Sequence, residues 1–268
     1  GVTFTDEYGD GSAVSGDVYF GPYTFAGATT NHGYFGVTNK EAGFAGQPQG
    51  LLGLSFSFGK DGGVTSSVGE VPIVALGLQS FGFYLSNSNN GDSGVFTTNG
   101  FDSSHVSGPF DFGYWQFDVT KGRAWVHNTF ATLSGLGSAF GSVPSAIADT
   151  GTTLVILPTS VARGIWGLIG ATDDGSGKGT ARIPCSVAQT GPDVSFTFGD
   201  PFHSVPASVY VLPNNDGTCT CGFAGGAEGQ GVTIFGDLFL RGTYSVSVAP
   251  LYILGNRPGE RPSSGQNS

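Results

Sequence analysis

The most informative stretch of this sequence is Ala146-Ile147-Ala148-Asp149-Thr150-Gly151-Thr152-Thr153-Leu154. It places one acidic residue directly after a short apolar strand and directly before a run of small hydroxyl residues. A carboxylate at the end of a buried strand needs hydrogen bonds, and the neighbouring hydroxyls and backbone N–H groups can supply them. Asp149 is therefore a candidate functional residue. The alternative is an ordinary turn, because Asp-Thr-Gly is also common turn chemistry.

The overall composition favours short strands. Among 268 residues there are 47 Gly, 22 Phe and 9 Tyr, a mixture typical of many strands joined by tight turns. Helix formers are scarce, with no Met and only 10 Lys plus Arg. The length allows two lobes, each with its own core. We therefore predict an all-β, bilobal protein.

The net charge of −10 argues against a nucleic-acid partner, because binding to phosphates requires clustered Lys and Arg. It suits a protein that works in acid, where many carboxylates are protonated, although solubility alone also explains such a charge. No apolar run reaches the ~18 residues that a membrane-spanning helix needs. The four His residues show no ligand spacing with one another or with Cys, so we expect neither a metal nor another cofactor.

The cysteines and the N-terminus bear on the compartment. Cys185, Cys219 and Cys221 allow one disulfide and leave one thiol. The chain opens directly in a strand pattern without a signal peptide, so we expect a processed or excised chain. A secreted or vacuolar location is the prediction.

Alternation and turn residues mark the individual elements. Residues 2–8 and 16–26 predict a hairpin around the turn at 9–12. Thr159, as an N-cap, and an apolar face up to Ile169 predict the clearest helix. We expect a short helix within 69–79 and further strands at 33–37, 50–55, 94–98, 114–119, 123–127, 146–149, 192–198, 208–212, 232–235 and 243–248.

A polar tract divides the chain. Residues 86–92 are Ser, Asn, Gly and Asp, a composition typical of a loop. We predict that residues 1–85 belong to one lobe and residues 86–268 to the other, with a Pro-, Gly- and Ser-rich tail from Asn256 that frays.

The string Asp149-Thr150-Gly151-Thr152-Thr153 resembles the second catalytic motif of the pepsin-like aspartic proteases, and the resemblance covers nearly the whole chain. The other matching segments follow in the family's order. They are the flap Tyr8-Gly9-Asp10-Gly11-Ser12, the apolar strand Gly50-Leu51-Leu52-Gly53-Leu54, the aromatic strand Gly113-Tyr114-Trp115-Gln116-Phe117, the disulfide cysteines Cys185 and Cys219, and the second apolar strand Ile234-Phe235-Gly236-Asp237.

The resemblance implies a catalytic role for this motif. In the family, two aspartates, one from each lobe, share a proton and activate the water molecule that attacks the scissile amide. Asp149 would be one of them, with Thr152 hydrogen-bonded to its outer oxygen and Thr150 at the base of the site. The backbone of Gly151 and the side chain of Thr153 would meet the substrate.

The resemblance also implies a flap and a pocket. Tyr8 would cover the reacting bond, while Gly9 and Asp10 would donate backbone hydrogen bonds to the substrate. Phe44 and Leu51 would line the apolar pocket before the cleavage point. Core packing is the alternative for both apolar residues.

The sequence departs from the family pattern in one large respect, because the first Asp-Thr-Gly motif is absent. The spacing from Asp149 to Gly236, applied to Gly53, places that aspartate roughly 34 residues before residue 1. Asp92-Ser93-Gly94 follows the polar tract and is interpreted as a turn. We therefore expect a companion N-terminal segment that carries the first aspartate, either as a separate chain or in an unprocessed form.

Three smaller departures accompany it. Gln49 replaces the usual Asp before the first apolar strand, and residues 246–252 lack the family's usual ending. Cys221 is an extra cysteine that is either free or competes with Cys219 for Cys185.

The sequence thus predicts an aspartic endopeptidase that acts on polypeptides at acid pH. The main alternative is a non-catalytic pepsin-like binding protein that kept the cleft and lost the aspartate pair. A lectin-like sandwich would explain the strands but not the motifs.

Overall fold

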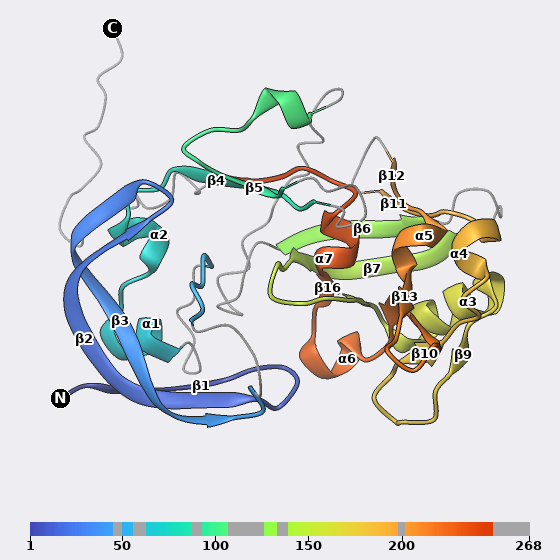
Figure 1. Cartoon of the computed structure of the whole chain (residues 1–268), viewed down its shortest axis with the longest axis horizontal. Helices are drawn as coiled ribbons and strands as arrows, with labels where there is room; N and C mark the ends of the chain where they lie inside the picture. Colours follow the sequence, from blue (N-terminus) through green and yellow to red (C-terminus); the bar gives the residue numbers. More distant parts are fainter. Residues whose placement is uncertain are drawn as a thin grey trace, which may run out of the picture.

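A computed structural model describes residues 1–44, 50–55, 63–86, 93–106, 126–132, 139–197 and 202–248. Strands dominate it, as the composition predicts, and the helices are short (Figure 1). The strands form one seven-stranded, one four-stranded and two three-stranded sheets. No helix within the described ranges is long and apolar enough to cross a membrane.

The predicted N-terminal hairpin is confirmed. Strand β1 (Thr3–Glu7) pairs antiparallel with β2 (Ala13–Phe25), in a register that runs from Thr3 opposite Asp17 to Glu7 opposite Ala13. The predicted strand at 33–37 lies within β3 (Ala28–Ala42), which pairs with the other edge of β2. In Figure 1 these strands form the long blue ribbons, and the β1–β2 turn projects from one end of them.

Strands β1, β2 and β3 form the N-terminal sheet, and its two faces differ in how exposed their side chains are. Side chains that stand opposite each other across an antiparallel pair share a face, and the pair Tyr19 and Phe35 is 51% and 41% exposed. The other face carries the buried Phe4, and it lies against the short helix α1 (Gly63–Val68). Helix α2 (Pro72–Ala75) confirms the predicted short helix and buries Ile73 in a small apolar core.

The C-terminal part of the chain returns to the N-terminal part. Strand β4 (Ser80–Tyr84) pairs with β5 (Val95–Thr98) on one side and with β17 (Ser245–Val248) on the other. The hydroxyl group of Tyr244 lies 2.9 Å from that of Thr97 and accepts the backbone N–H of Asp102 at 2.9 Å. Asp102 is the N-cap of the 3₁₀ turn η2 (Ser103–His105). The position of a lobe boundary at residue 86 stays a prediction.

The seven-stranded sheet forms much of the core of the C-terminal part. Its order is β12-β11-β6-β7-β16-β8-β15, so β16 lies between β7 and β8. The strands are β6 (Val126–Thr132), β7 (Ala139–Ala148), β8 (Val155–Ile156), β11 (Val194–Thr197), β12 (Phe202–Val205), β15 (Phe223–Ala224) and β16 (Thr233–Phe235). Strand β16 runs parallel to β7, with Ile234 opposite Ile147, and antiparallel to β8.

The predicted helix at 159–169 is confirmed as α3 (Thr159–Ile169). Its apolar face is buried, and the indole N–H of Trp166 donates to the carbonyl oxygen of Phe223 at 2.8 Å. The expected N-cap at Thr159 is wrong, because the capping position is Pro158 and Thr159 is already helical. Glu228, from α6 (Ala227–Gln230), accepts the backbone N–H of Thr159 at 2.6 Å and its hydroxyl at 3.0 Å.

The remaining elements complete the C-terminal core. A four-stranded sheet has the order β13-β14-β10-β9. Its strands are β9 (Thr172–Asp173), β10 (Ala181–Arg182), β13 (Val211–Pro213) and β14 (Cys219–Cys221). The remaining short helices are α4 (Val187–Thr190), α5 (Ala207–Tyr210) and α7 (Asp237–Leu240).

Two predicted strands are wrong, at least in part. Residues 50–55 form no strand, and Leu51 is 61% exposed. The expected strand at 208–212 begins as helix α5, because the carbonyl oxygen of Pro206 accepts the N–H groups of Val209 and Tyr210 at 2.9 and 3.2 Å and closes a helical turn. The predicted strand at 114–119, the aromatic segment 113–117, Gln49, Asp92 and the tail from Asn256 lie outside the described residues.

Candidate active site

Asp149 follows the last residue of strand β7 and is half-buried. Its backbone N–H donates to the carbonyl oxygen of Phe235 at 3.1 Å, which continues the pairing of β7 with β16 by one residue. The chain then turns sharply, and the N–H of Thr152 donates back to the carbonyl oxygen of Asp149 at 3.3 Å. The side chain is thus held at the point where a central strand ends.

Each oxygen of the Asp149 carboxylate accepts a hydrogen bond from the residues that follow it. The backbone N–H of Gly151 donates to Oδ1 at 2.9 Å, and the hydroxyl of Thr152 donates to Oδ2 at 2.7 Å. These bonds fix the orientation of the carboxylate, because both donors belong to the same tight turn. The hydrogen bond that the resemblance implies between Thr152 and Asp149 is present.

The two other threonines of the motif are not among the donors to the Asp149 carboxylate. Thr150 is exposed, and no hydrogen bond joins its hydroxyl to another residue of the described ranges. Thr153 is exposed too, and its carbonyl oxygen accepts the N–H of Leu238 at 3.1 Å. The roles of Thr150 at the base of the site and of Thr153 toward substrate stay predictions.

A second segment crosses directly over the motif. Asp237 donates its N–H to the carbonyl oxygen of Thr152 at 2.7 Å, and Gly236 donates to that of Leu154 at 3.2 Å. A Cβ atom on Gly236 would collide with the carbonyl oxygens of both Thr152 and Leu154. A glycine directly after an apolar strand permits this close approach of two backbones. At Gly53, the related position, no described atom lies within 4 Å of such a Cβ.

Asp237 is a titratable group of this site whose role was not predicted from the sequence. It is half-buried, and its Oδ1 has no hydrogen-bond partner among the described residues. Burial raises its pKa from the ordinary value of 3.8 to about 6. The charge of Arg241 lowers this pKa and that of Asp149 raises it, so Asp237 and Asp149 influence each other. The sequence feature that could have identified Asp237 is its position directly after Gly236, at the end of the second apolar strand.

The flap hairpin closes through a compact turn. Tyr8 donates its N–H to the carbonyl oxygen of Ser12 at 2.8 Å, and Gly11, with a φ of +84°, donates to that of Tyr8 at 2.9 Å. The carboxylate of Asp10 accepts the backbone N–H and the hydroxyl of Ser12 at 2.9 and 2.6 Å. These bonds, the hydroxyl first, lower the pKa of Asp10. Gly9 and Asp10 are exposed at the tip.

The structure brings two of the predicted flap and pocket residues together. The rings of Tyr8 and Phe44 meet edge to face, with centroids 5.3 Å apart and planes at 76°. Leu51, by contrast, is exposed to solvent. No hydrogen bond or ring contact within the described ranges joins Tyr8 to Asp149. The substrate-facing roles of Tyr8, Phe44 and Leu51 stay predictions.

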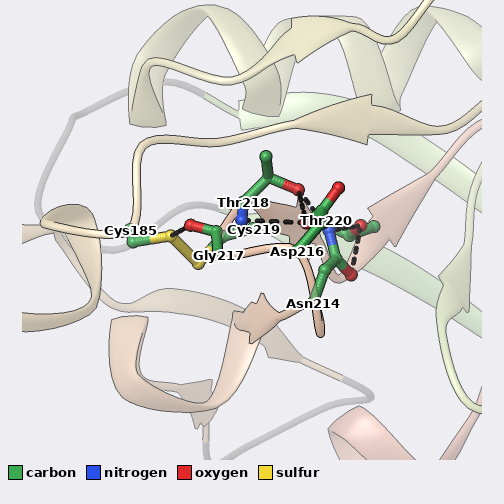
Figure 2. Close-up of a disulfide and its surroundings, with 7 residues drawn as sticks. All are labelled: Cys185, Asn214, Asp216, Gly217, Thr218, Cys219 and Thr220. Carbon is green, nitrogen blue, oxygen red and sulfur yellow. Dashed lines mark hydrogen bonds between the residues drawn. A yellow bond between two sulfur atoms is a disulfide. The ribbon is translucent and has the colours of Figure 1, made fainter.

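The predicted disulfide is present. Cys185 and Cys219 are joined, with Cα atoms 5.4 Å apart, and Figure 2 shows the bond beside the β13–β14 hairpin. In that hairpin the Asn214 amide donates to the hydroxyl groups of Thr218 and Thr220 at 2.9 and 3.1 Å. Cys221 is free and fully buried, so the alternative pairing with Cys185 is not adopted. Burial raises the pKa of its thiol to about 11.

A metal centre is not formed by these residues. Within the described ranges, no three side chains of His, Cys, Asp or Glu come together in a way that would hold a metal ion.

Comparisons with known proteins agree on one family. The model of the eukaryotic aspartyl protease family matches residues 1–248. Rhizopuspepsin-4 of Rhizopus niveus is 34% identical over 254 residues, which is 92% of this chain and 61% of that protein. Pepsin A of Bos taurus is 30% identical over 259 residues, 91% of this chain and 65% of that protein. The chain therefore spans less than two thirds of the length of these relatives.

A solved structure gives the same fold. The aspartic proteinase from Irpex lacteus superposes with a TM-score of 0.74 at 21% sequence identity, over 92% of this chain and 78% of that one. At this identity the match shows the fold alone, which is that of the pepsin-like aspartic proteases. The family model covers more than half of the sequence, and the turn that holds Asp149 lies inside the matched range. The chain belongs to the eukaryotic aspartyl protease family.

Proposed function

We propose that this protein is an aspartic endopeptidase that cleaves polypeptides at acid pH. Water would be activated between two aspartates, Asp149 on this chain and a second on an N-terminal segment that completes the site. The observation that carries the proposal is the carboxylate of Asp149, fixed by Gly151 and Thr152 at the end of a central strand. A turn that served only the fold would not need a half-buried carboxylate close to a second one, that of Asp237.

The chemistry follows from two carboxyl groups that share one proton. Two like charges placed close together cannot both ionise easily, and pepsin itself is the standard example of such a pair. The ionised member takes a proton from the water as it attacks the amide carbon, and the protonated member stabilises the developing oxyanion. Fixed hydrogen-bond donors such as Gly151 and Thr152 keep Asp149 in one orientation during these transfers.

Two observations support a companion N-terminal segment. The curated relatives extend beyond the matched portion, since the chain covers 61% of rhizopuspepsin-4 and 65% of pepsin A. Apolar side chains are also exposed on the N-terminal sheet, where Tyr19, Phe20 and Val37 are each about half accessible. They lie on both of its faces, because Phe20 and Tyr19 alternate along one strand. A further polypeptide segment, packed against residues 1–85, would cover them.

The proposed activity also implies a companion segment, a class of substrate and a cellular compartment. The companion segment would carry its own Asp-Thr-Gly or Asp-Ser-Gly, and the substrates would be polypeptides bound beneath the flap at Tyr8, Gly9 and Asp10. A secreted or vacuolar compartment suits both the disulfide between Cys185 and Cys219 and an acid-acting enzyme.

The experiment separates the chains of the native protein. Its denatured intact mass, with and without reduction, would reveal a second polypeptide or a longer chain. The native protein is then assayed for peptide cleavage at pH 4 and pH 7, with and without pepstatin, and residues 1–268 are refolded and assayed alone.

Three outcomes are distinct. Pepstatin-sensitive cleavage at pH 4 by the native protein, lost when residues 1–268 are refolded alone, supports the whole proposal. Activity from residues 1–268 alone would contradict the need for a companion segment. Pepstatin binding without any cleavage would favour the non-catalytic binding protein.

A further inference from the structure

Residues 228–231 form a short exposed segment between two buried residues. Ala227 before it and Val232 after it are only 4% and 6% exposed, whereas Glu228 is exposed. The segment includes most of α6 and leads into β16, after which the chain crosses the turn that holds Asp149. In Figure 1 α6 lies on the side of the C-terminal part that faces the blue N-terminal strands. The exposed segment can therefore move while the buried residues on either side of it stay packed.

Glycines at both ends of α6 permit such a motion. Gly226, the N-cap of α6, has a φ of +112°, and Gly231, its C-cap, has a φ of +69°. A Cβ at Gly226, Gly229 or Gly231 would meet no described atom within 4 Å, so close packing does not fix these positions. The backbone there needs another contact to hold it in one place.

The carboxylate of Glu228 supplies such a contact. Its Oε1 accepts the backbone N–H of Thr159 at 2.6 Å, and its Oε2 accepts the hydroxyl of the same residue at 3.0 Å. Thr159 is the first residue of α3, where unpaired backbone N–H groups favour a negative charge. Gly229 and Gly231 have no side chain that could replace this contact.

The contacts just before the exposed segment are of a different kind. The N–H of Gly225 donates to the carbonyl oxygen of Gly179 at 2.8 Å, and the N–H of Ala227 donates to that of Leu157 at 3.1 Å. Both are bonds between backbone groups, which do not titrate. They should therefore be equally strong in acid and at neutral pH.

We propose that Glu228 is a pH-operated latch: its ionised carboxylate fastens residues 228–231 to the start of α3, and its protonation in acid releases them. A protonated carboxyl group accepts only a neutral hydrogen bond, which is weaker than a bond to a charged oxygen. The latch belongs to the fold of the C-terminal part and does not depend on peptide cleavage.

Hydrogen bonds favour the ionised form of Glu228. They lower its pKa from the ordinary value of 4.5, the bond from its own backbone N–H first and that from the Thr159 N–H second. The fastened carboxyl group thus has a lower pKa than a released one. The latch is therefore closed above pH 4.5 and opens as the pH falls below that value.

The charged groups on neighbouring elements do not account for this effect. Arg163, one turn into α3, lies 3.8 Å from Asp173. In the loop that contacts Gly225, Asp174 accepts hydrogen bonds from other residues of the same loop, and Lys178 is exposed. None of these four charged side chains is among the causes of the lowered pKa of Glu228.

The experiment measures hydrogen exchange of single backbone amides in the native protein at pH 6 and pH 3. Wild type is compared with Glu228→Gln and with Glu41→Gln, a control on the exposed part of β3. Each rate is divided by that of an unstructured chain at the same pH, which gives a protection factor.

At pH 6, Glu228→Gln should lower the protection of three amides about tenfold, the loss expected for a hydrogen bond to a charged group. They are the amide of Thr159, which donates to the latch, and those of Gly229 and Gly231 in the exposed segment. Wild type should approach this variant at pH 3. The variant itself should not change between the two pH values, and Glu41→Gln should match wild type.

The amide of Gly225 is the internal control, because its acceptor, the carbonyl oxygen of Gly179, does not titrate. Equal protection of Thr159 at pH 6 and pH 3 in wild type would overturn the proposal. A loss at Thr159 without one at Gly229 and Gly231 would overturn it too, because the cap would then hold no loop. An equal loss at Gly225 would show that the whole region loosens in acid, which also contradicts a latch. If Glu228→Gln fails to fold, the pH series on wild type decides alone.

Discussion

Asp237 donates its backbone N–H to the carbonyl oxygen of Thr152 at 2.7 Å, which ties the first residue of helix α7 to the turn that holds Asp149. Its carboxyl group is half-buried there, and burial raises its pKa from 3.8 to about 6. Two acidic side chains therefore lie within electrostatic reach at one strand end. The raised pKa of Asp237 makes the stability of the folded protein depend on pH.

Replacing Asp237 by Asn should make folding less dependent on pH. Between about pH 4 and pH 6 the unfolded chain ionises this carboxyl group while the folded protein keeps it protonated, so stability falls as pH rises and the penalty is constant above pH 6. At pH 7, Asp237→Asn should be more stable than wild type by about 1–3 kcal/mol, and near pH 3.5 the two should agree. Urea unfolding at several pH values measures this.

The matched control for that series is Glu41→Gln, on the exposed part of β3. A stability difference that does not change between pH 3.5 and pH 7 would show that Asp237 ionises normally.

Asp149→Asn should lower kcat by several orders of magnitude in the assembled enzyme, because an amide cannot share the proton of the aspartate pair. The amide has only one acceptor oxygen and can keep the bond from Thr152 while losing that from Gly151, so the melting temperature should fall by only a few degrees. Asp193→Asn, at an exposed position, should leave the kinetics unchanged. Activity of Asp149→Asn within tenfold of wild type would remove Asp149 from the mechanism.

Gly236→Ala should destabilise the protein by about 3 kcal/mol or more, because its methyl group would collide with two backbone carbonyl groups that cannot both move. Thermal or urea unfolding measures the loss. Gly229→Ala in α6, where a Cβ meets no atom within 4 Å, should cost less than about 1 kcal/mol. Similar losses in the two variants would mean that the backbone around Gly236 has room for a methyl group.

Removing the disulfide by Cys185→Ser with Cys219→Ser should cost roughly 3–4 kcal/mol, because the bond joins residues 34 apart in the chain. Guanidinium unfolding of both forms without reductant measures this, and equal midpoints would contradict it.

Cys221 offers a separate probe of the folded state. Its side chain is fully buried, and burial raises the pKa of its thiol to about 11, so little reactive thiolate is accessible to reagents. It should resist iodoacetamide in the native protein at pH 8 and react once the protein is unfolded. Rapid reaction in the native state would place the thiol at the surface.

The features predictable from sequence are those with a local cause. The periodic apolar face of 159–169 predicted α3 with its observed ends, and the hairpin around Gly9 to Ser12 was visible from its turn residues. Asp149 could be selected because its hydrogen-bond donors follow it within three residues.

The features that sequence could not predict depend on distant parts of the chain. Thr159 looked like a cap, yet its cap ligand, Glu228, comes from a separate helix. The pKa of Asp237 depends on burial, which no local pattern reveals.

The position of β16 between β7 and β8 has a consequence for biosynthesis. A nascent chain that has emerged only as far as α3 has made β7 and β8, yet the strand that separates them has not been translated. Until residues 233–238 leave the ribosome, these two strands present open edges that invite aggregation. The backbone contacts from Gly236 and Asp237 to the Asp149 turn are also missing until then. The turn that holds Asp149 therefore cannot gain these backbone contacts before residue 238 has been translated.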